Sequence, residues 1–211
     1  NIMRGLLWAS ASVSVAVLVV IVGYIFYKGF SYISFDFIFG DYSPSGGGGI
    51  FPMIVTTILM ILISLLIATP IGILAAVYLH EYAKQGRLVS IIRYATESLT
   101  GIPSIIYGLF GAVFFVAILK LGMSIIAASL TLTIIVLPVI IRTTEEALKT
   151  VPATYREGSL ALGTTKLQTL LKVILPSAMP GILSGIILSI GRIVGESAAI
   201  FLTAGTVAAM P

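Results

Sequence analysis

The sequence predicts an all-α fold, a bundle of membrane-spanning helices. Hydrophobic residues make up 58% of the 211-residue chain and charged residues only 9%, whereas soluble domains carry roughly 25% charged residues. A helix needs about 20 apolar residues to cross the hydrocarbon core of a bilayer. Charge-free runs of at least that length lie at residues 5–27, 42–79, 98–119 and 121–141. We therefore expect a single transmembrane domain over residues 1–211.

Five spans are expected in order, at about residues 5–28, 51–79, 95–119, 122–142 and 178–203. Each of the three middle spans contains one proline, at Pro70, Pro103 and Pro138. Proline removes a helix hydrogen bond and kinks the axis, and membrane helices tolerate this where neighbours satisfy the freed carbonyl. A polar insert at residues 143–177 separates the fourth span from the fifth.

Basic residues are distributed unequally between the two sides of the expected membrane. One side receives only Lys28 and Lys120. The other receives nine basic residues: Arg4, Lys84, Arg87, Arg93, Arg142, Lys149, Arg156, Lys166 and Lys172. By the positive-inside rule the nine-residue side is cytoplasmic, which places the N-terminus inside. The net charge of +4 is therefore a topology signal and does not indicate a nucleic-acid partner.

The polar insert is expected to form two short helices at the membrane surface. Pro152 suits the first turn of a helix, and Gly163 allows a tight turn because glycine adopts positive φ at little cost. An apolar stripe at helical spacing follows, formed by Leu167, Leu170, Leu171 and Ile174. We expect Pro176 and Pro180 to end the insert. An interfacial amphipathic helix without a partner would explain the stripe, but we favour a docking element for another protein.

The fifth span carries two charges within an apolar stretch. Arg192 lies near the middle of residues 181–203, where a charge costs about 2.5–3.5 kcal/mol on insertion scales and so faces protein or a wet cavity. Glu196 is four positions on and would share its helix face. The two residues form a structural ion pair, or Arg192 lines a pathway and binds a passing anion through its planar fork of donors. We favour the pathway. Gly181 and Gly185 on this face would allow another helix to approach closely.

Further charged residues lie near the cytoplasmic boundary. Arg142 ends the fourth span, as a topology anchor or as a second contact for the anion. Arg93 and Glu97 have the i, i+4 spacing of a helical ion pair, and a structural role is expected for them.

Several kinds of chemistry are not expected. The chain has no cysteine, which excludes disulfides, thiolate metal sites and cysteine nucleophiles. It lacks the G-x4-G-K-[ST] phosphate loop, so it does not bind ATP by that route. The single histidine, His80, lies at a membrane boundary, and no metal site and no catalytic constellation is expected.

The insert contains the spacing E-x5-G-x9-V-x-L-P, formed by Glu157, Gly163, Val173, Leu175 and Pro176. This spacing resembles the cytoplasmic coupling loop of ABC importer permeases, which docks into an ATPase subunit. With residues 48–83, 100–111, 140–182 and 191–205, the chain resembles the inner-membrane permease subunits of the phosphate-specific ABC importer, the A-type subunit more than its C-type paralogue.

The resemblance implies a non-catalytic transport subunit that works by alternating access in a bacterial or archaeal plasma membrane. It implies a homologous permease subunit, two ATP-binding subunits, an extracytoplasmic phosphate-binding protein and phosphate as partners, with ATP bound only by the ATPases. It assigns the substrate pathway to Arg142, Arg192 and Glu196. It assigns ATPase coupling to Glu157, Gly158, Ser159, Gly163, Leu175 and Pro176.

Two departures from the family pattern are visible. The coupling motif usually begins Glu-Ala-Ala, whereas this chain has Glu157-Gly158-Ser159, and glycine weakens a helix by up to ~1 kcal/mol. Family members usually have a sixth span, whereas this sequence stops at Pro211. We therefore expect a fragment that lacks part of its bundle.

Other functions are compatible with parts of the pattern. Permeases for other oxyanions, such as sulfate or molybdate, share the coupling loop, so phosphate rests on the resemblance. A passive anion channel would need Arg192 but not the insert. A structural membrane scaffold would use Arg192 and Glu196 only to hold helices together.

Overall fold

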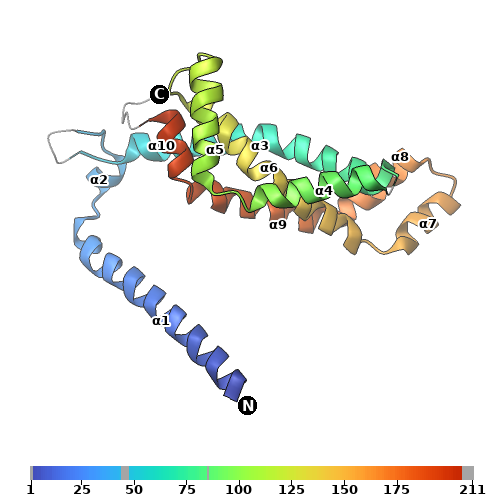
Figure 1. The fold of residues 1–211 in the computed structure, drawn as a ribbon, viewed down its shortest axis with the longest axis horizontal. Helices are drawn as coiled ribbons and strands as arrows, with labels where there is room; N and C mark the ends of the chain where they lie inside the picture. Colours follow the sequence, from blue (N-terminus) through green and yellow to red (C-terminus); the bar gives the residue numbers. More distant parts are fainter. Residues whose placement is uncertain (1, 44–47, 85, 206–211) are drawn as a thin grey trace. The chain divides into compact units, whose positions relative to one another are not determined.

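The computed structural model describes residues 2–43, 48–84 and 86–205 (Figure 1). Within these ranges all regular secondary structure is helical and no strand is present. The described residues fall into two compact units, and the boundary between them along the chain lies between Ile54 and Val55. The prediction of an all-α fold is confirmed.

The first unit contains α1 (Ile2–Gly29), the 3-10 turn η1 (Phe30–Tyr32) and α2 (Phe35–Phe39). α1 is mostly apolar between Arg4 and Lys28 and covers the predicted first span. Ser34 caps α2, because its Oγ accepts a hydrogen bond from the Phe37 amide at 3.1 Å. Such a cap satisfies an amide that the first turn of the helix leaves without a partner.

The second unit holds the rest of the bundle. In chain order its helices are α3 (Phe51–Val77), η2 (Tyr78–Tyr82), α4 (Arg87–Thr100), α5 (Ser104–Gly111), η3 (Ala112–Ile118), α6 (Ile125–Thr150), α7 (Ala153–Ala161), α8 (Lys166–Thr169), η4 (Leu170–Ile174), α9 (Leu175–Val194) and α10 (Ala198–Ala204). The segments η2, η3 and η4 are π-helical, and α3 begins in the first unit.

Helix α6 is the most buried element of the second unit and packs against α4, α5, α9 and α10. Its side chains Leu132, Ile135, Val136 and Ile140 lie at the centre of the main apolar cluster. α3 is joined to α6 by a buried hydrogen bond from Ser64 Oγ to the Ser129 carbonyl, 3.0 Å long. Because side chains on α6 are covered on several sides, this helix sets the positions of its neighbours.

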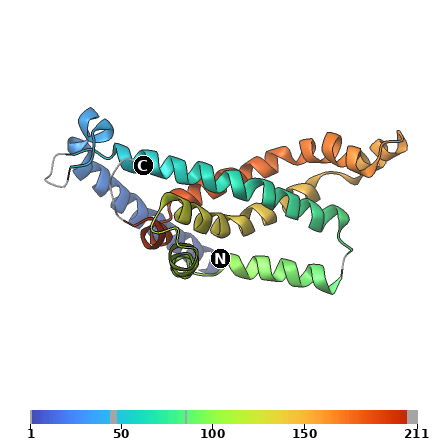
Figure 2. The same cartoon turned by 90° about the horizontal axis from the view of Figure 1, so that it is seen from above.

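The other helices expose apolar side chains to their surroundings. On α3, the exposed residues Ile58, Leu62 and Leu66 recur every four positions, which places them along one side of the helix. Among the described residues, four helices are long and apolar enough to cross a membrane, and the count reaches five if the bent pair α4 and α5–η3 is one span. Figure 2 shows α3 and α6 running side by side.

The structure corrects the predicted third span at residues 95–119. α4 ends at Thr100, and the chain bends by 98° before continuing as α5 and η3. Pro103 lies at this bend, directly before α5. Proline disfavours helical geometry in the residue that precedes it, which favours a break between the two helices here. Pro70 and Pro138, in contrast, lie inside α3 and α6.

The fifth span also differs from the prediction of one helix over residues 178–203. α9 ends at Val194, and α10 begins only at Ala198. At the other end, Pro176 and Pro180 do not end the insert, because the helix continues from Lys166 to Val194. The π-helical η4 ends two residues before Pro176, and its wider turn relieves the crowding that proline imposes on the carbonyl four residues earlier.

Candidate coupling segment and substrate pathway

α6 continues past residue 142 to Thr150, so the predicted insert begins inside that helix. We define the coupling segment as residues 153–174, which comprise α7, the turn after it, α8 and η4. Of the predicted coupling residues, Glu157, Gly158, Ser159 and Gly163 lie in this segment. Leu175 and Pro176 lie in the first turn of α9. Figures 1 and 2 both show α7 and α8 at the end of the second unit that is far from α5 and α10.

The turn between α7 and α8 depends on local chemistry that the sequence shows. Gly163 has φ +84°, a conformation that costs other residues about 1–2 kcal/mol. Thr165 and Gln168 form a capping box at the start of α8, in which each side chain bonds the other residue's backbone amide. The predicted order of helix, turn and helix is therefore present.

Three hydroxyl groups hold α7 and α8 together. The Oγ of Ser159 lies 2.8 Å from Thr164 Oγ1 and 3.0 Å from Thr169 Oγ1, and the two threonine hydroxyls are 2.8 Å apart. Ser159 and Thr169 are buried. The serine that replaces the usual alanine therefore has a structural partner on α8, and this network was not predicted.

The outer surface of the coupling segment carries exposed groups. Glu157 and Gly158 are exposed, and so are the large side chains of Tyr155 and Leu162, the latter at 86%. A leucine with so little cover on the tip of a turn is available for a protein contact. The docking role of these residues remains a prediction.

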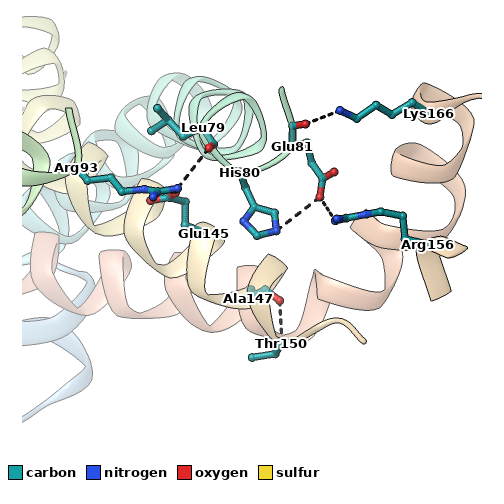
Figure 3. A network of polar contacts seen from close by, with 9 residues as sticks. All are labelled: Leu79, His80, Glu81, Arg93, Glu145, Ala147, Thr150, Arg156 and Lys166. Atoms are coloured by element: carbon teal, nitrogen blue, oxygen red, sulfur yellow. Dashed lines mark hydrogen bonds and ion pairs between the residues drawn. The ribbon is translucent and has the colours of Figure 1, made fainter. Parts of the chain in front are cut away.

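The end of α3 binds the coupling segment through Glu81, which sequence reasoning did not identify as a site residue. The guanidinium of Arg156 on α7 donates to the Glu81 carboxylate, whose side chain is only 5% exposed. Lys166 Nζ donates to the Glu81 carbonyl at 2.6 Å. Figure 3 shows these groups converging on Glu81. The partners lie too far apart in sequence for any periodic signal to have revealed them.

A second charged cluster joins α4 to α6. Arg93 bonds Glu145 at 2.9 Å, and Arg142 bonds Glu97 at 3.2 Å and Glu146 at 3.1 Å. Arg93 and Glu97 were expected to pair with each other along α4, whereas the observed ion pairs join each of them to α6. These groups line a cavity of about 190 Å³. Arg142 is thus held between two carboxylates, an arrangement that fits an anchor between helices.

The structure overturns the expected Arg192–Glu196 pair. Among the described residues no ion pair joins the two, because α9 ends between them and they no longer share a helix face. The Glu196 carboxylate instead accepts a hydrogen bond from the Ala199 amide at 3.3 Å and caps α10. Arg192 is partly buried near the end of α9, and its charge is not neutralised by Glu196.

The predicted close approach at Gly181 and Gly185 is present. A Cβ atom at Gly181 would lie 2.6 Å from Ala147 Cβ, and one at Gly185 would lie 2.1 Å from Thr143 Oγ1. These glycines bring α9 against α6.

Comparison with known proteins decides the family. Residues 68–210 match the family described as "Binding-protein-dependent transport system inner membrane component". The chain belongs to this family. Its fold is also shared by solved structures of the MetNI methionine ABC transporter in inward-facing conformations. One of these matches with a TM-score of 0.60 and 26% identity, over 74% of this chain and 73% of the solved one.

Curated relatives are phosphate and ABC permeases. The chain is 39% identical to the probable ABC transporter permease protein YqgI of Bacillus subtilis over 95% of its own length and 69% of the relative's. It is 39% identical to the phosphate transport system permease protein PstA 1 of Mycobacterium tuberculosis over 75% of its length, and it spans about half of that relative (52%). It is 39% identical to the phosphate transport system permease protein PstA of Pasteurella multocida, over 84% of this chain and 63% of the relative.

Proposed function

We propose that this chain is a transmembrane permease subunit of an ATP-driven importer that carries inorganic phosphate into the cell. The family match and the relatives named for phosphate transport support this role. The structural observation that carries it is the coupling segment, an ordered and exposed pair of helices at one end of the bundle. A passive channel or a scaffold has no use for such a segment.

The proposed assembly contains a homologous permease, two ATP-binding subunits and an extracytoplasmic phosphate-binding protein. The coupling segment faces the cytoplasm, as does the N-terminus. ATP-driven closure of the ATPases moves this segment and shifts the bundle between two states, whose populations the docked ATPases bias. Glu157 and Gly163 contribute contact and shape to the docking surface.

Within the bundle, we place the substrate contact at Arg192 before Arg142. Arg192 lies at a helix break and has no acidic partner in Glu196, whereas Arg142 is already bonded to two carboxylates. A guanidinium offers several donors to an oxyanion, and weak binding allows release. Glu196 then acts indirectly, by holding the start of α10.

The test is ATP-dependent phosphate uptake in proteoliposomes that contain the full-length subunit, its paralogue, the ATPases and the binding protein. A charged hydrogen bond contributes about 1.5–3 kcal/mol, so Arg192→Gln should lower uptake at least about tenfold while assembly and ATP hydrolysis persist. Arg87→Gln, at an exposed position outside the pathway, is the matched control.

Each rival predicts a different result. Phosphate flux without the ATPases would favour a passive channel. Normal uptake by the Arg192→Gln variant would place the pathway on another helix, with Arg142 examined next. Uptake of sulfate but not phosphate by the wild-type assembly would support the permease role and refute the substrate.

A further inference from the structure

Glu81 is a buried carboxylate in η2, the π-helical turn that continues α3, and its partners come from the coupling segment. Burial of a charged group is tolerated only where an opposite charge or hydrogen bonds compensate for the lost water. Arg156 supplies the charge from α7, and His80 Nε2 lies 3.6 Å away. The ion pair between Glu81 and Arg156 therefore joins η2 to α7, with its carboxylate buried and its guanidinium partly exposed.

Lys166 makes a second connection to the same place. Its Nζ donates to the Glu81 carbonyl at 2.6 Å and lies 4.7 Å above the centre of the Tyr82 ring. The last carbonyls of a helix lack intrahelical donors and attract cations, and a cation over an aromatic face is stabilised further. Lys166 and Arg156 therefore both bind Glu81 in η2, Lys166 at its carbonyl and Arg156 at its carboxylate.

The two connections act through one body, because α7 and α8 are joined by the hydroxyls of Ser159, Thr164 and Thr169. Arg156 lies on α7 and Lys166 on α8, on either side of the turn at Gly163. A displacement of the segment therefore reaches Glu81 from both helices at once.

The other side of η2 is bound to the bundle. Arg93 on α4 donates to the Leu79 carbonyl at 3.4 Å and bonds Glu145 on α6. The π-helical turn closes with a bond from the Ala83 amide to the Tyr78 carbonyl, 2.8 Å long. Single π-helical turns, in which the hydrogen bond joins residues five positions apart, occur often at functional positions. η2 therefore lies between the coupling segment and the helices α4 and α6.

We propose that Glu81 is a positioning residue that transmits displacement of the coupling segment to α3. The segment already continues into α9 and is linked by Val151 and Pro152 to α6, whereas α3 is joined to α6 farther along the bundle, through apolar packing and the hydrogen bond from Ser64 to Ser129. The Glu81 connection makes α3 move with the ATPases. This inference rests on the proposed function.

The test is the number of phosphate ions taken up per ATP hydrolysed by the full assembly in proteoliposomes. Glu81→Gln and Arg156→Gln should each assemble, keep ATP hydrolysis and lower this ratio several-fold. Both substitutions break the same ion pair. The double variant should therefore lower the ratio no further than the more damaging of the two single variants does. Arg87→Gln, an exposed basic position on α4, should keep the wild-type ratio.

The outcomes separate the two proposals. Wild-type assemblies without ATP-dependent phosphate uptake would refute the proposed function and the Glu81 proposal with it. Wild-type uptake together with an unchanged ratio in Arg156→Gln would refute the Glu81 proposal alone. Glu81→Gln decides the matter even if Arg156→Gln fails to assemble, and an unchanged ratio in it refutes the proposal. It leaves unpaired only Arg156, whose side chain is 41% exposed, whereas Arg156→Gln leaves the buried Glu81 carboxylate without its cation. The Glu81 proposal would also be refuted if the double variant lowered the ratio by the product of the two single effects.

Discussion

Two glycines in the coupling segment should respond in opposite ways to alanine. Gly163 has φ +84°, and a Cβ atom there would meet nothing within 4 Å. The cost of Gly163→Ala is therefore purely one of backbone conformation, about 1–2 kcal/mol. Gly158 lies inside α7, is exposed, and also has open space around it. Gly158→Ala should stabilise α7 by up to ~1 kcal/mol, because alanine is the better helix former.

Hydrogen exchange of the α7 and α8 amides measures this directly, since exchange follows the free energy of local opening. One to two kcal/mol corresponds to a factor of about 5–30. Gly163→Ala should speed exchange by that factor, and Gly158→Ala should slow it about fivefold. α6 amides, whose surroundings are unchanged, serve as the internal reference. Unaltered exchange in Gly163→Ala would show that the turn does not require positive φ, and faster exchange in Gly158→Ala would show that α7 is not the helix described here.

Two further substitutions test the packing of α9 and α10. Gly185→Ala would place a Cβ atom 2.8 Å from Thr143 Cβ, so it should destabilise the protein by about 1–3 kcal/mol and lower its Tm. Gly191→Ala on the same helix meets nothing within 4 Å and should leave Tm unchanged or raised; equal effects of the two would contradict the close approach. Glu196→Ala should remove the hydrogen bond from the Ala199 amide, at about 0.5–1.5 kcal/mol, and speed exchange of the α10 amides. Glu196→Gln retains an acceptor oxygen and should leave the exchange of the α10 amides unchanged. Equal effects of Glu196→Ala and Glu196→Gln would indicate that the negative charge matters.

Local features of this fold could be predicted from the sequence. The first two spans match α1 and α3 closely, because hydrophobic length alone signals a membrane helix. Gly163 was expected at a positive-φ turn for its backbone freedom, and the structure places it there. A kink was expected at Pro103, and the structure has a 98° bend there that divides the predicted span. The break after Val194 was missed, because hydropathy does not report where the helix hydrogen bonds end.

The candidate site shows the same division. The motif from Glu157 to Pro176 identifies the coupling segment by spacing alone, but the pairing of charges could not be read in this way. Glu196 is four positions from Arg192, and helical spacing predicted a contact that the end of α9 removes. Glu81 carries no local signal, because its partner Arg156 is 75 positions away.

The sequence by itself determined that this protein is a helical membrane bundle with an ordered polar segment of the importer type. Apolar run length, turn glycines and capping residues act over a few positions and are visible in one dimension. Only the tertiary structure decided which charges meet, because a buried carboxylate takes whichever cation packing brings to it. The connection of Glu81 to Arg156 and Lys166, and the separation of Arg192 from Glu196, are consequences of how the helices end and pack.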